Sequence, residues 1–256
     1  MNNLADKVVL VTGGANGIGK AIATQFAQAG ARVVIADIDG EAGEKTAVSI
    51  SQATGATVTA VRTDITDLDN VQATIAQVVG ENGRLDIVVN NAGWDRFGLF
   101  METTPNFWDR VIAINYKGLL NMTYAALPQM IEQRDGCFVN IASDAGRGGS
   151  MGESVYAGCK AAVIAFSKTI AREHARDNIR VNVVAPGITD TAIFNSFNDT
   201  TLGGKVASAM VKSVPLGRRA ADPSEIAPAI VFLASDAASY ITGQVLSVSG
   251  GLTMVD

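Results

Sequence analysis

The stretch Thr12-Gly13-Gly14-Ala15-Asn16-Gly17-Ile18-Gly19 separates two segments whose hydrophobic patterns differ. Before it, Val8–Val11 is a short, continuous apolar run rich in β-branched residues, which predicts a strand covered on both faces. After it, Ile22 and Phe26 continue a three- and four-residue repeat that begins at Ile18, and Gly30 follows as a stop signal. A strand, a glycine-rich turn and a helix in this order predict the first unit of a parallel α/β sheet.

The same alternation of short apolar runs and longer helical segments continues along the whole chain. The runs are Val8–Val11, Val33–Ala36, Val58–Val61, Ile87–Val89, Phe138–Ile141, Val181–Val184 and Val245–Val248. Strands that alternate with helices pair in parallel through right-handed crossovers. We therefore predict an α/β fold of the Rossmann type, in which a doubly wound parallel sheet of about seven strands carries helices on both faces.

The chain shows no linker, composition shift or internal repeat, so we interpret residues 1–256 as one domain. Residues 188–219 interrupt the alternation with a polar, glycine-containing segment followed by helical spacing up to Val211. Long insertions in a compact domain are often functional loops. We expect this insertion to be a substrate lid, because it follows a strand end where ligands bind in open parallel sheets. The alternative is a surface excursion without function.

Composition excludes several classes of protein. The 256 residues are 48% hydrophobic and 18% charged, unlike a disordered chain. A net charge of −5, with Lys and Arg scattered, argues against nucleic-acid binding. One histidine and two cysteines are too few for a zinc site of about four ligands, so we expect no metal. No signal peptide or apolar window of about 18 residues is visible, so we expect a cytoplasmic protein that does not insert into membranes.

The glycine turn has the properties of a diphosphate-binding loop. Gly13 permits the tight turn, Gly17 lets backbone approach a diphosphate, and Gly19 lets the helix pack close to the sheet. The free N–H groups of the helix N-terminus then face the anion. Asp37 ends the second strand, where a carboxylate bonds the ribose hydroxyls of adenosine and repels a 2′-phosphate. No Arg or Lys stands at positions 13–19, 38 or 39. These features predict NAD rather than NADP as cofactor.

Two further strand ends fall at the same edge of the predicted sheet. Asp64-Ile65 follows the third strand, where an acid can bond the adenine amino group, and Asn90-Asn91-Ala92-Gly93 follows the fourth. The small residues of the second motif would line the cofactor cleft. Taken alone, each motif is also compatible with an ordinary cap or turn.

Tyr156 and Lys160 are four residues apart at the start of a helical segment, so they share one helix face. An ammonium within ~4–6 Å of a phenol favours the phenolate and lowers its pKa. Tyr156 is therefore a candidate general base, and a general acid in reverse. Ser143 ends the fifth strand, where its hydroxyl can polarise a carbonyl, and Asn115 lies in an apolar helical segment where its amide needs a partner. The Tyr-x-x-x-Lys pair alone is common on solvated helix faces.

Taken together, these motifs resemble those of the short-chain dehydrogenase/reductase family over the full length of the chain. The resemblance rests on Thr12–Gly19, Asp64, Asn90–Gly93, Asn115, Ser143, Tyr156-x-x-x-Lys160 and Pro186-Gly187. It implies that Asn115, Ser143, Tyr156 and Lys160 are catalytic, with Lys160 holding the nicotinamide ribose and Asn115 holding a water. It also implies a homotetramer. The predicted NAD-binding residues are Gly13, Asn16, Gly17, Ile18, Gly19, Asp37, Ile38, Asp64, Ile65, Asn91, Ala92, Gly93, Tyr156, Lys160, Pro186, Gly187, Ile188, Thr189 and Thr191.

Further motifs, among them Asn90–Asp95, Gly152–Tyr156 and Ile241–Met254, resemble the branch of the family that oxidises 2-hydroxycyclohexanecarboxyl-CoA with NAD. This resemblance implies a secondary-alcohol dehydrogenase for a cyclic β-hydroxyacyl-CoA or a cyclic or aryl alcohol. The predicted substrate-binding residues are Ser143, Trp94, Glu153, Tyr156 and Phe194. Two alternatives remain open: a 3-oxoacyl-[acyl-carrier-protein] reductase, which usually uses NADP, and a non-catalytic NAD-binding scaffold.

Overall fold

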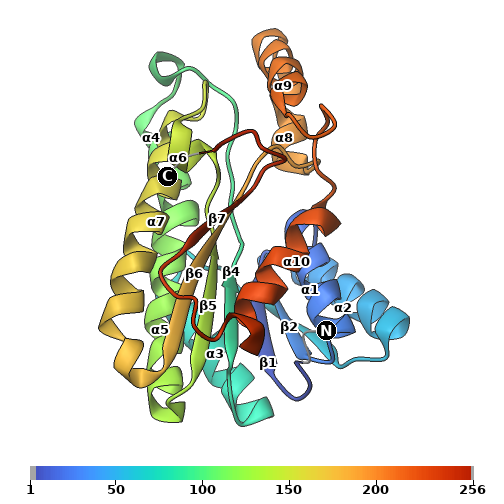
Figure 1. Cartoon of the computed structure of the whole chain (residues 1–256), viewed down its shortest axis with the longest axis vertical. Coiled ribbons are helices and arrows are strands. Elements are labelled where there is room, and N and C mark those ends of the chain that lie inside the picture. The colour runs from blue at the N-terminus through green and yellow to red at the C-terminus, as the bar shows by residue number, and fades with distance from the viewer. Residues whose placement is uncertain (1–3, 255–256) are drawn as a thin grey trace.

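The predicted strands form a parallel sheet in the computed structural model of the chain, which describes residues 4–254. Within those residues the sheet has seven strands in the order β3-β2-β1-β4-β5-β6-β7, which confirms the predicted fold class (Figure 1). The strands are β1 (Val8–Thr12), β2 (Arg32–Asp37), β3 (Val58–Arg62), β4 (Ile87–Asn90), β5 (Gly136–Ile141), β6 (Ile179–Pro186) and β7 (Val245–Val248). All of the pairs are parallel.

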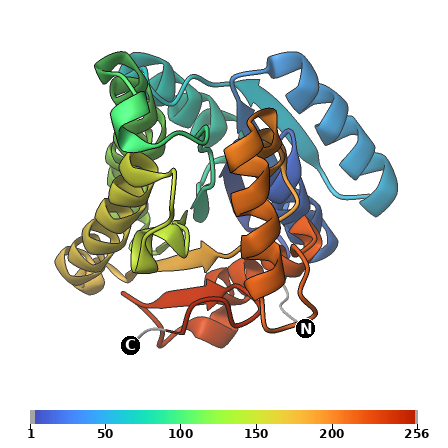
Figure 2. The ribbon, with the colours of Figure 1, turned by 90° about the horizontal axis from the view of Figure 1, so that it is seen from above.

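Helices cover both faces of the sheet (Figures 1 and 2). The α-helices are α1 (Gly17–Gln28), α2 (Gly40–Thr54), α3 (Leu68–Asn82), α4 (Pro105–Ile112), α5 (Gly118–Gln133), α6 (Ala145–Gly148), α7 (Ser154–Glu173), α8 (Ala192–Asn195), α9 (Thr201–Ser213) and α10 (Pro223–Ala234). Shorter helical segments are η1 (Phe100–Glu102), η2 (Ala113–Lys117), η3 (Ala175–Asp177), η4 (Ser196–Asp199) and η5 (Asp236–Ala238). Within the described residues, no helix combines the length and apolar character needed to cross a bilayer.

The continuous apolar runs are explained by the two faces of the sheet. Successive side chains of a strand point to opposite faces. Along β1, Val9 and Val11 join a core with α1, α2 and α10, whereas Val8 and Leu10 join a core with α3, α5 and α7. Because both faces are buried, each position of such a strand requires an apolar side chain.

The order of the strands places a crevice beside β1. The chain moves outward from β1 through β2 to β3, returns to β4 on the other side of β1, and then moves outward in the opposite direction to β7. Loops that leave β1 and β4 therefore diverge at the carboxyl ends of these strands. In open α/β sheets this switch point is where ligands bind.

The insertion at residues 188–219 lies at this same end of the sheet. It contains α8, η4 and α9, and Figure 2 shows α9 between the side formed by α4, α6 and α7 and the side formed by α1 and α2. Phe97, Phe197 and Ala207 form a small buried cluster that attaches the insertion to the loop after β4. The insertion is therefore anchored on the loop after β4 by apolar side chains.

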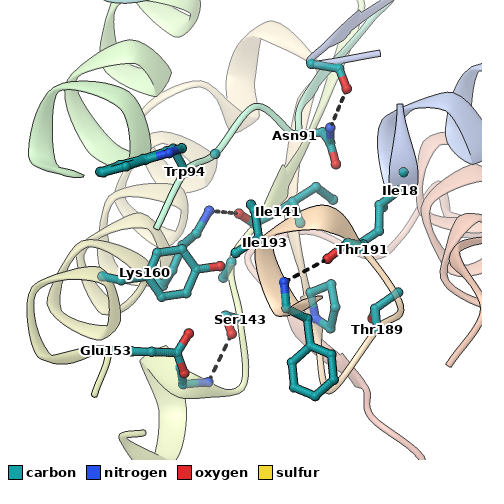
Figure 3. A pocket seen from close by; sticks show the side chains of 18 of the residues that line it. Ile18, Asn91, Trp94, Ile141, Ser143, Glu153, Lys160, Thr189, Thr191 and Ile193 are labelled. Atoms are coloured by element: carbon teal, nitrogen blue, oxygen red, sulfur yellow. Dashed lines mark hydrogen bonds between the residues drawn. The ribbon is translucent and has the colours of Figure 1, made fainter. Parts of the chain in front are cut away.

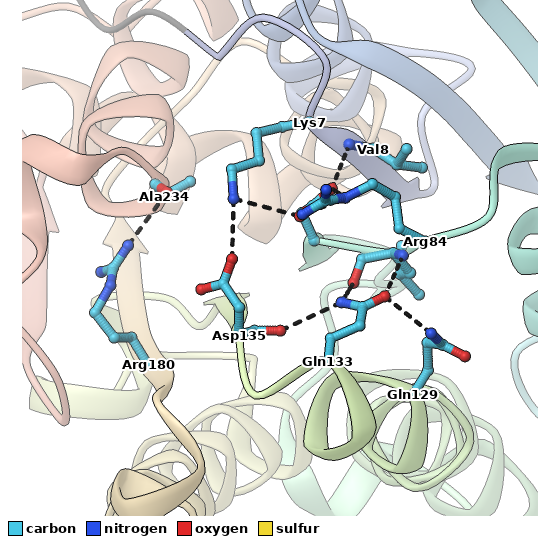
Figure 4. A network of polar contacts seen from close by, with 10 residues as sticks. Lys7, Val8, Arg84, Gln129, Gln133, Asp135, Arg180 and Ala234 are labelled. Atoms are coloured by element: carbon cyan, nitrogen blue, oxygen red, sulfur yellow. Dashed lines mark hydrogen bonds and ion pairs between the residues drawn. The ribbon is translucent and has the colours of Figure 1, made fainter.

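A polar network closes the opposite end of the sheet (Figure 4). Asp86 is 2% exposed, receives hydrogen bonds from the Val8 backbone N–H at 2.8 Å and from Arg84, and forms an ion pair with Lys7 at 3.3 Å. Lys7 also pairs with Asp135 at 2.9 Å. These contacts join the starts of β1, β4 and β5, so a buried carboxylate at this end of the sheet is fully compensated.

Candidate active site

A cavity of about 1270 Å³ opens at the carboxyl ends of the strands. A pocket for one small ligand has roughly 300–1,000 Å³, so this cavity has room for a dinucleotide together with a substrate. With the exception of Asn115, all of the predicted site residues line it. Figure 3 shows Ser143, Glu153, Lys160 and Trp94 on one side and Ile18, Thr189 and Thr191 on the other.

The glycine turn forms the floor of the cavity. Gly13 has φ +63°, and a Cβ there would lie 2.9 Å from the Cα of Ala92. The N-cap of α1, Asn16, makes no side-chain capping hydrogen bond, so the first N–H groups of the helix remain available to an anion. Thr191, from the insertion, lies opposite Gly17. The turn therefore fits a dinucleotide diphosphate between α1 and the insertion.

Gly19→Ala is expected to destabilise the fold by about 1–3 kcal/mol and to abolish tight cofactor binding. A Cβ at Gly19 would lie 2.0 Å from the carbonyl oxygen of Gly13 and 2.6 Å from the Asn91 amide nitrogen, so the turn must move. Chemical denaturation and a fluorescence titration with NADH measure the two effects.

The matched control is Gly80→Ala in α3, where an added Cβ meets nothing within 4 Å. This variant is expected to gain about 0.5–1 kcal/mol, because alanine has the better helix propensity. A Gly19→Ala protein that denatures and binds NADH like the Gly80→Ala protein would contradict the role of the turn.

Asp37 lies at the rim of the cavity, at the end of β2. Its Oδ2 accepts a hydrogen bond from the Ala15 N–H at 3.0 Å, and its Oδ1 accepts one from the Asp39 N–H at 3.1 Å. These contacts hold the carboxylate over the glycine turn. Arg62 is the residue paired with Asp37 on the neighbouring strand β3, and its side chain does not line the cavity. This position of the carboxylate fits an adenosine ribose with a free 2′-hydroxyl.

Asp64 and Asn91 are held in place by local hydrogen bonds. Asp64 Oδ1 accepts from the backbone N–H of Thr66 at 2.9 Å and from its hydroxyl at 2.7 Å. The Asn91 amide donates to the carbonyl oxygens of Thr12 at 2.9 Å and Gly13 at 3.1 Å. The Asn91 side chain therefore joins the loop after β4 to the glycine turn.

Ser143, Tyr156 and Lys160 meet where β5 ends and α7 begins. Lys160 is 3% exposed, and its ammonium donates to the Ile141 carbonyl oxygen at 2.9 Å and lies 5.3 Å from the centroid of the Tyr156 ring. Burial lowers the pKa of Lys160 to about 8, so the amine still carries a proton at neutral pH. The Ser143 hydroxyl accepts a hydrogen bond from the Ala145 N–H at 3.1 Å, which fixes its orientation.

The electrostatics of Tyr156 differ from the sequence prediction. Its pKa is raised rather than lowered, first by burial and then by the nearby carboxylates of Glu153 and Asp95. Hydrogen bonding to Ser143 acts in the opposite direction but is weaker. The prediction of a lowered pKa was wrong for the protein's own groups, because burial and two carboxyl groups act against it: Glu153, three residues before Tyr156 in the sequence, and Asp95, which only the fold brings near.

Asn115 lies behind the cavity, in the π-helical segment η2 rather than in a regular helix. Its Oδ1 accepts from the Trp94 N–H at 3.2 Å, and its amide donates to the carbonyl oxygens of Trp94 at 2.6 Å and Val111 at 2.9 Å. The amide thus finds backbone partners. Asn115 and Lys160 also line an internal cavity of about 10 Å³, close to the volume that one water molecule needs.

The predicted substrate residues form the end of the cavity next to Ser143. The ring of Trp94 lies under the guanidinium of Arg110, 4.0 Å from the ring centroid. Phe194 packs on Phe197 with ring centroids 5.8 Å apart. Glu153 lines the same region and accepts a hydrogen bond from Ser150. One wall is therefore aromatic and apolar, and the other carries a carboxyl group.

Sequence reasoning missed two residues of this region. Arg110 lines the cavity mouth, and Asp95 is a buried carboxyl whose charge acts on Tyr156 and Lys160. Arg110 belongs to no motif with a recognised spacing, and Asp95 is only the last residue of the motif Asn90–Asp95, which assigns it no role. The sequence does place Asp95 next to Trp94, but its burial depends on contacts with residues more than fifty positions away.

Comparisons with known proteins agree with this geometry. Residues 13–253 match the family described as Enoyl-(Acyl carrier protein) reductase. The chain is 43% identical to the 3-oxoacyl-[acyl-carrier-protein] reductase FabG of Chlamydia trachomatis, over 97% of this chain and 98% of the relative. It is 41% identical to the protein of the same name from Thermotoga maritima, over 98% and 99%. The chain belongs to the short-chain dehydrogenase/reductase family.

A solved structure of the same fold is the NAD⁺-bound xylitol dehydrogenase, with a TM-score of 0.91 and 33% identity over 97% of this chain and 99% of that one. The short-chain dehydrogenase/reductase family explains the cavity: its members are oxidoreductases that use a nicotinamide cofactor. The chain is therefore an enzyme rather than a non-catalytic scaffold. The bacterial relatives from Chlamydia and Thermotoga are 3-oxoacyl reductases, so they agree with the predicted alternative and not with the predicted cyclic substrate.

Proposed function

We propose that the chain catalyses the NAD(H)-linked interconversion of 3-oxoacyl and 3-hydroxyacyl thioesters. One observation carries the proposal: the Ser143 hydroxyl and the Tyr156 phenol open into the same cavity as the apolar side chains of Phe194 and Met210. A cavity of this kind fits a ketone attached to an acyl chain. The names of the curated relatives support the 3-oxoacyl class, and the position of Asp37 supports NAD over NADP.

Each catalytic side chain has a distinct task in this proposal. Ser143 donates a hydrogen bond to the substrate oxygen, and Tyr156 gives that oxygen a proton during reduction or removes one during oxidation. Lys160 holds the nicotinamide ribose, and Asn115 holds the water that continues the proton path from Lys160. The bound nicotinamide supplies or accepts the hydride at the carbon that bears the oxygen. The remaining predicted cofactor residues hold the dinucleotide along the cavity.

We further propose that residues 188–219 serve as the lid over the acyl chain, since Phe194, Val206 and Met210 from this segment line the cavity. A homotetramer, as the family resemblance implies, also remains a proposal, which analytical ultracentrifugation tests.

A cyclic acyl thioester is a second candidate substrate. The observation that favours it is the flat wall formed by Trp94, which is held by Asn115 on its backbone and by Arg110 on its ring. A kcat/KM for a 2-oxocyclohexanecarboxyl thioester above that for an acetoacetyl thioester would favour the cyclic class. The reverse order would favour the open-chain class.

At pH 8, the enzyme is expected to reduce neutral derivatives of acetoacetate at least about tenfold more efficiently than acetoacetate itself. Glu153 places a carboxyl group in the cavity beside Ser143, and Asp95, whose pKa is about 7, is negative at pH 8 behind it. The cations of this end are already engaged, Lys160 with the Ile141 carbonyl oxygen and Arg110 with the Trp94 ring, so a substrate carboxylate is disfavoured there. Repulsion between like charges at about 4 Å costs roughly 1–4 kcal/mol in partly solvated sites. The measurement compares kcat/KM with NADH for acetoacetyl-N-acetylcysteamine, methyl acetoacetate and acetoacetate.

Methyl acetoacetate is the control that separates charge from the thioester. If both neutral compounds outperform acetoacetate, charge governs the choice. Acetoacetate reduced as efficiently as the neutral compounds would contradict the idea that the cavity end beside Ser143 disfavours a negative substrate. The proposed function itself would be refuted if no 3-oxo compound were turned over with either NADH or NADPH.

A further inference from the structure

Asp95 is a buried acidic residue that no side chain within residues 4–254 bonds directly. It is 4% exposed and lies in the loop between β4 and η1, directly after Trp94. Among residues 4–254, neither of its carboxylate oxygens has a hydrogen-bond partner of standard geometry. Buried carboxyl groups are normally paired, as Asp86 is at the other end of the sheet. Fold stability therefore does not explain this residue.

The loop that carries Asp95 is held at both ends. On one side, Asn115 bonds both the N–H and the carbonyl oxygen of Trp94. On the other, the Gly98 N–H donates to the Gly152 carbonyl oxygen at 3.0 Å, and Phe97 packs so tightly on Gly152 that a Cβ there would lie 2.3 Å from the ring. The anchors hold Asp95 against the start of α7.

The charged and titratable groups that face Tyr156 come from two elements. Helix α7 and its N-cap contribute Glu153, Cys159 and Lys160, and the loop after β4 contributes Asp95. The Arg96 backbone N–H and the Lys160 ammonium lower the pKa of Asp95, and Glu153 raises it by less than the Arg96 N–H lowers it. Lys160 is fixed on the Ile141 carbonyl oxygen. Tyr156 is therefore next to two carboxyl groups as well as one ammonium.

Both carboxyl groups lose their protons at a higher pH than exposed carboxyl groups do. Burial, with a smaller contribution from Glu153, raises the pKa of Asp95 to about 7. Burial also raises the pKa of Glu153, while the hydrogen bond from Ser150 lowers it. Asp95 therefore gains its negative charge as the pH approaches 7, and Glu153 gains its own at a higher pH than an exposed glutamate does. A carboxylate beside a phenol disfavours the phenolate.

We propose that Asp95 and Glu153 form a carboxyl pair that keeps Tyr156 protonated and so favours its role as proton donor in ketone reduction. The inference rests on the proposed function, in which Tyr156 exchanges a proton with the substrate oxygen. Asp95 does not line the cavity and acts through Tyr156, so it is a positioning residue. Glu153 lines the cavity and has the same electrostatic effect from the substrate side.

The test is the pH dependence of kcat/KM in both directions for the wild type, Asp95→Asn and Glu153→Gln. Each variant removes one negative charge with little change of shape. In each variant, we expect the part of the kcat/KM profile that reports the ionisation of Tyr156 to move to lower pH by about 0.5–1 unit. At a pH where kcat/KM for oxidation is still rising, this value is then about three- to tenfold higher than in the wild type. The kcat/KM for reduction begins to fall at a lower pH than in the wild type.

Glu173→Gln is the matched control, because Glu173 ends the same helix about 30 Å from Glu153, at 1.5 Å per residue. Its pH profile should superimpose on that of the wild type. Thermal denaturation and NADH titration show whether each variant is folded, and Glu153→Gln carries the test if Asp95→Asn does not fold.

The outcomes separate this inference from the proposed function. If Tyr156→Phe is inactive but the profiles of Asp95→Asn and Glu153→Gln match the wild type or shift to higher pH, the carboxyl-pair inference is overturned and the proposed function stands. If Tyr156→Phe keeps full turnover, Tyr156 is not the proton donor and the carboxyl-pair inference fails with it. If the wild type turns over no 3-oxoacyl thioester with NADH or NADPH, the proposed function itself fails.

Discussion

Tyr156→Phe is expected to lower kcat about 10²–10⁴-fold, the range that a general acid or base contributes. The phenol is the only group with an exchangeable proton that the substitution removes, while the ring and its contact with the Lys160 ammonium remain. Cofactor affinity should change little, since the glycine turn, Asp37 and Lys160 are untouched. Steady-state kinetics with NADH and an acetoacetyl thioester, together with an NADH titration, measure both quantities.

Tyr124→Phe is the matched control for this variant. Tyr124 is 65% exposed on α5, and it does not line the cavity, so loss of its hydroxyl should leave kcat unchanged. A Tyr156→Phe enzyme whose kcat is within a few-fold of the Tyr124→Phe enzyme would remove Tyr156 from the chemistry. A Tyr156→Phe enzyme that also loses NADH binding would assign the residue to the cofactor site instead.

The second large effect concerns the choice between NADH and NADPH. Asp37→Asn is expected to change the ratio of kcat/KM for NADH to that for NADPH by roughly 10- to 10³-fold in favour of NADPH. The wild-type carboxylate repels a 2′-phosphate, whereas asparagine keeps an oxygen that can accept hydrogen bonds from the Ala15 N–H and the ribose. The wild type should therefore prefer NADH, and the variant should lose most of this preference.

Asp39→Asn tests whether the effect belongs to position 37 alone. Asp39 is the N-cap of α2 and does not line the cavity, and asparagine caps a helix as well as aspartate does. For the Asp39→Asn enzyme, the ratio of kcat/KM for NADH to that for NADPH should stay close to the wild-type ratio. A wild-type enzyme that prefers NADPH would overturn the assignment of Asp37, and an equal change in both variants would mean that general surface charge controls the choice.

Local residues were enough to predict which side chains line the proposed cofactor half of the cavity. The glycine turn, Asp37 and Asp64 each stand at a fixed position relative to a strand, and the parallel topology then brings all strand ends to one edge. Predicting these positions requires no knowledge of which side chains touch. The same reasoning placed Ser143, Tyr156 and Lys160 together, because a strand end and one helix turn define them.

The electrostatics of the catalytic side could not be predicted in this way. Whether the pKa of a buried phenol rises or falls depends on every charge within a few ångströms and on its desolvation. Asp95 reaches Tyr156 only because Asn115 and Gly152 hold its loop from two distant parts of the chain. Likewise, Asn115 finds its partners on Trp94 through a π-helical segment that no hydrophobic repeat indicates.

The parallel sheet, its seven strands and the edge at which the cavity opens could all be predicted before any contact was known, because hydrophobic period and turn chemistry are properties of neighbouring residues. The folded chain was needed to learn which carboxyl groups face Tyr156 and which backbone carbonyl holds Lys160. These features depend on burial and on contacts between segments far apart in the chain. The free energy of a buried charge is set by those surroundings rather than by its neighbours in sequence.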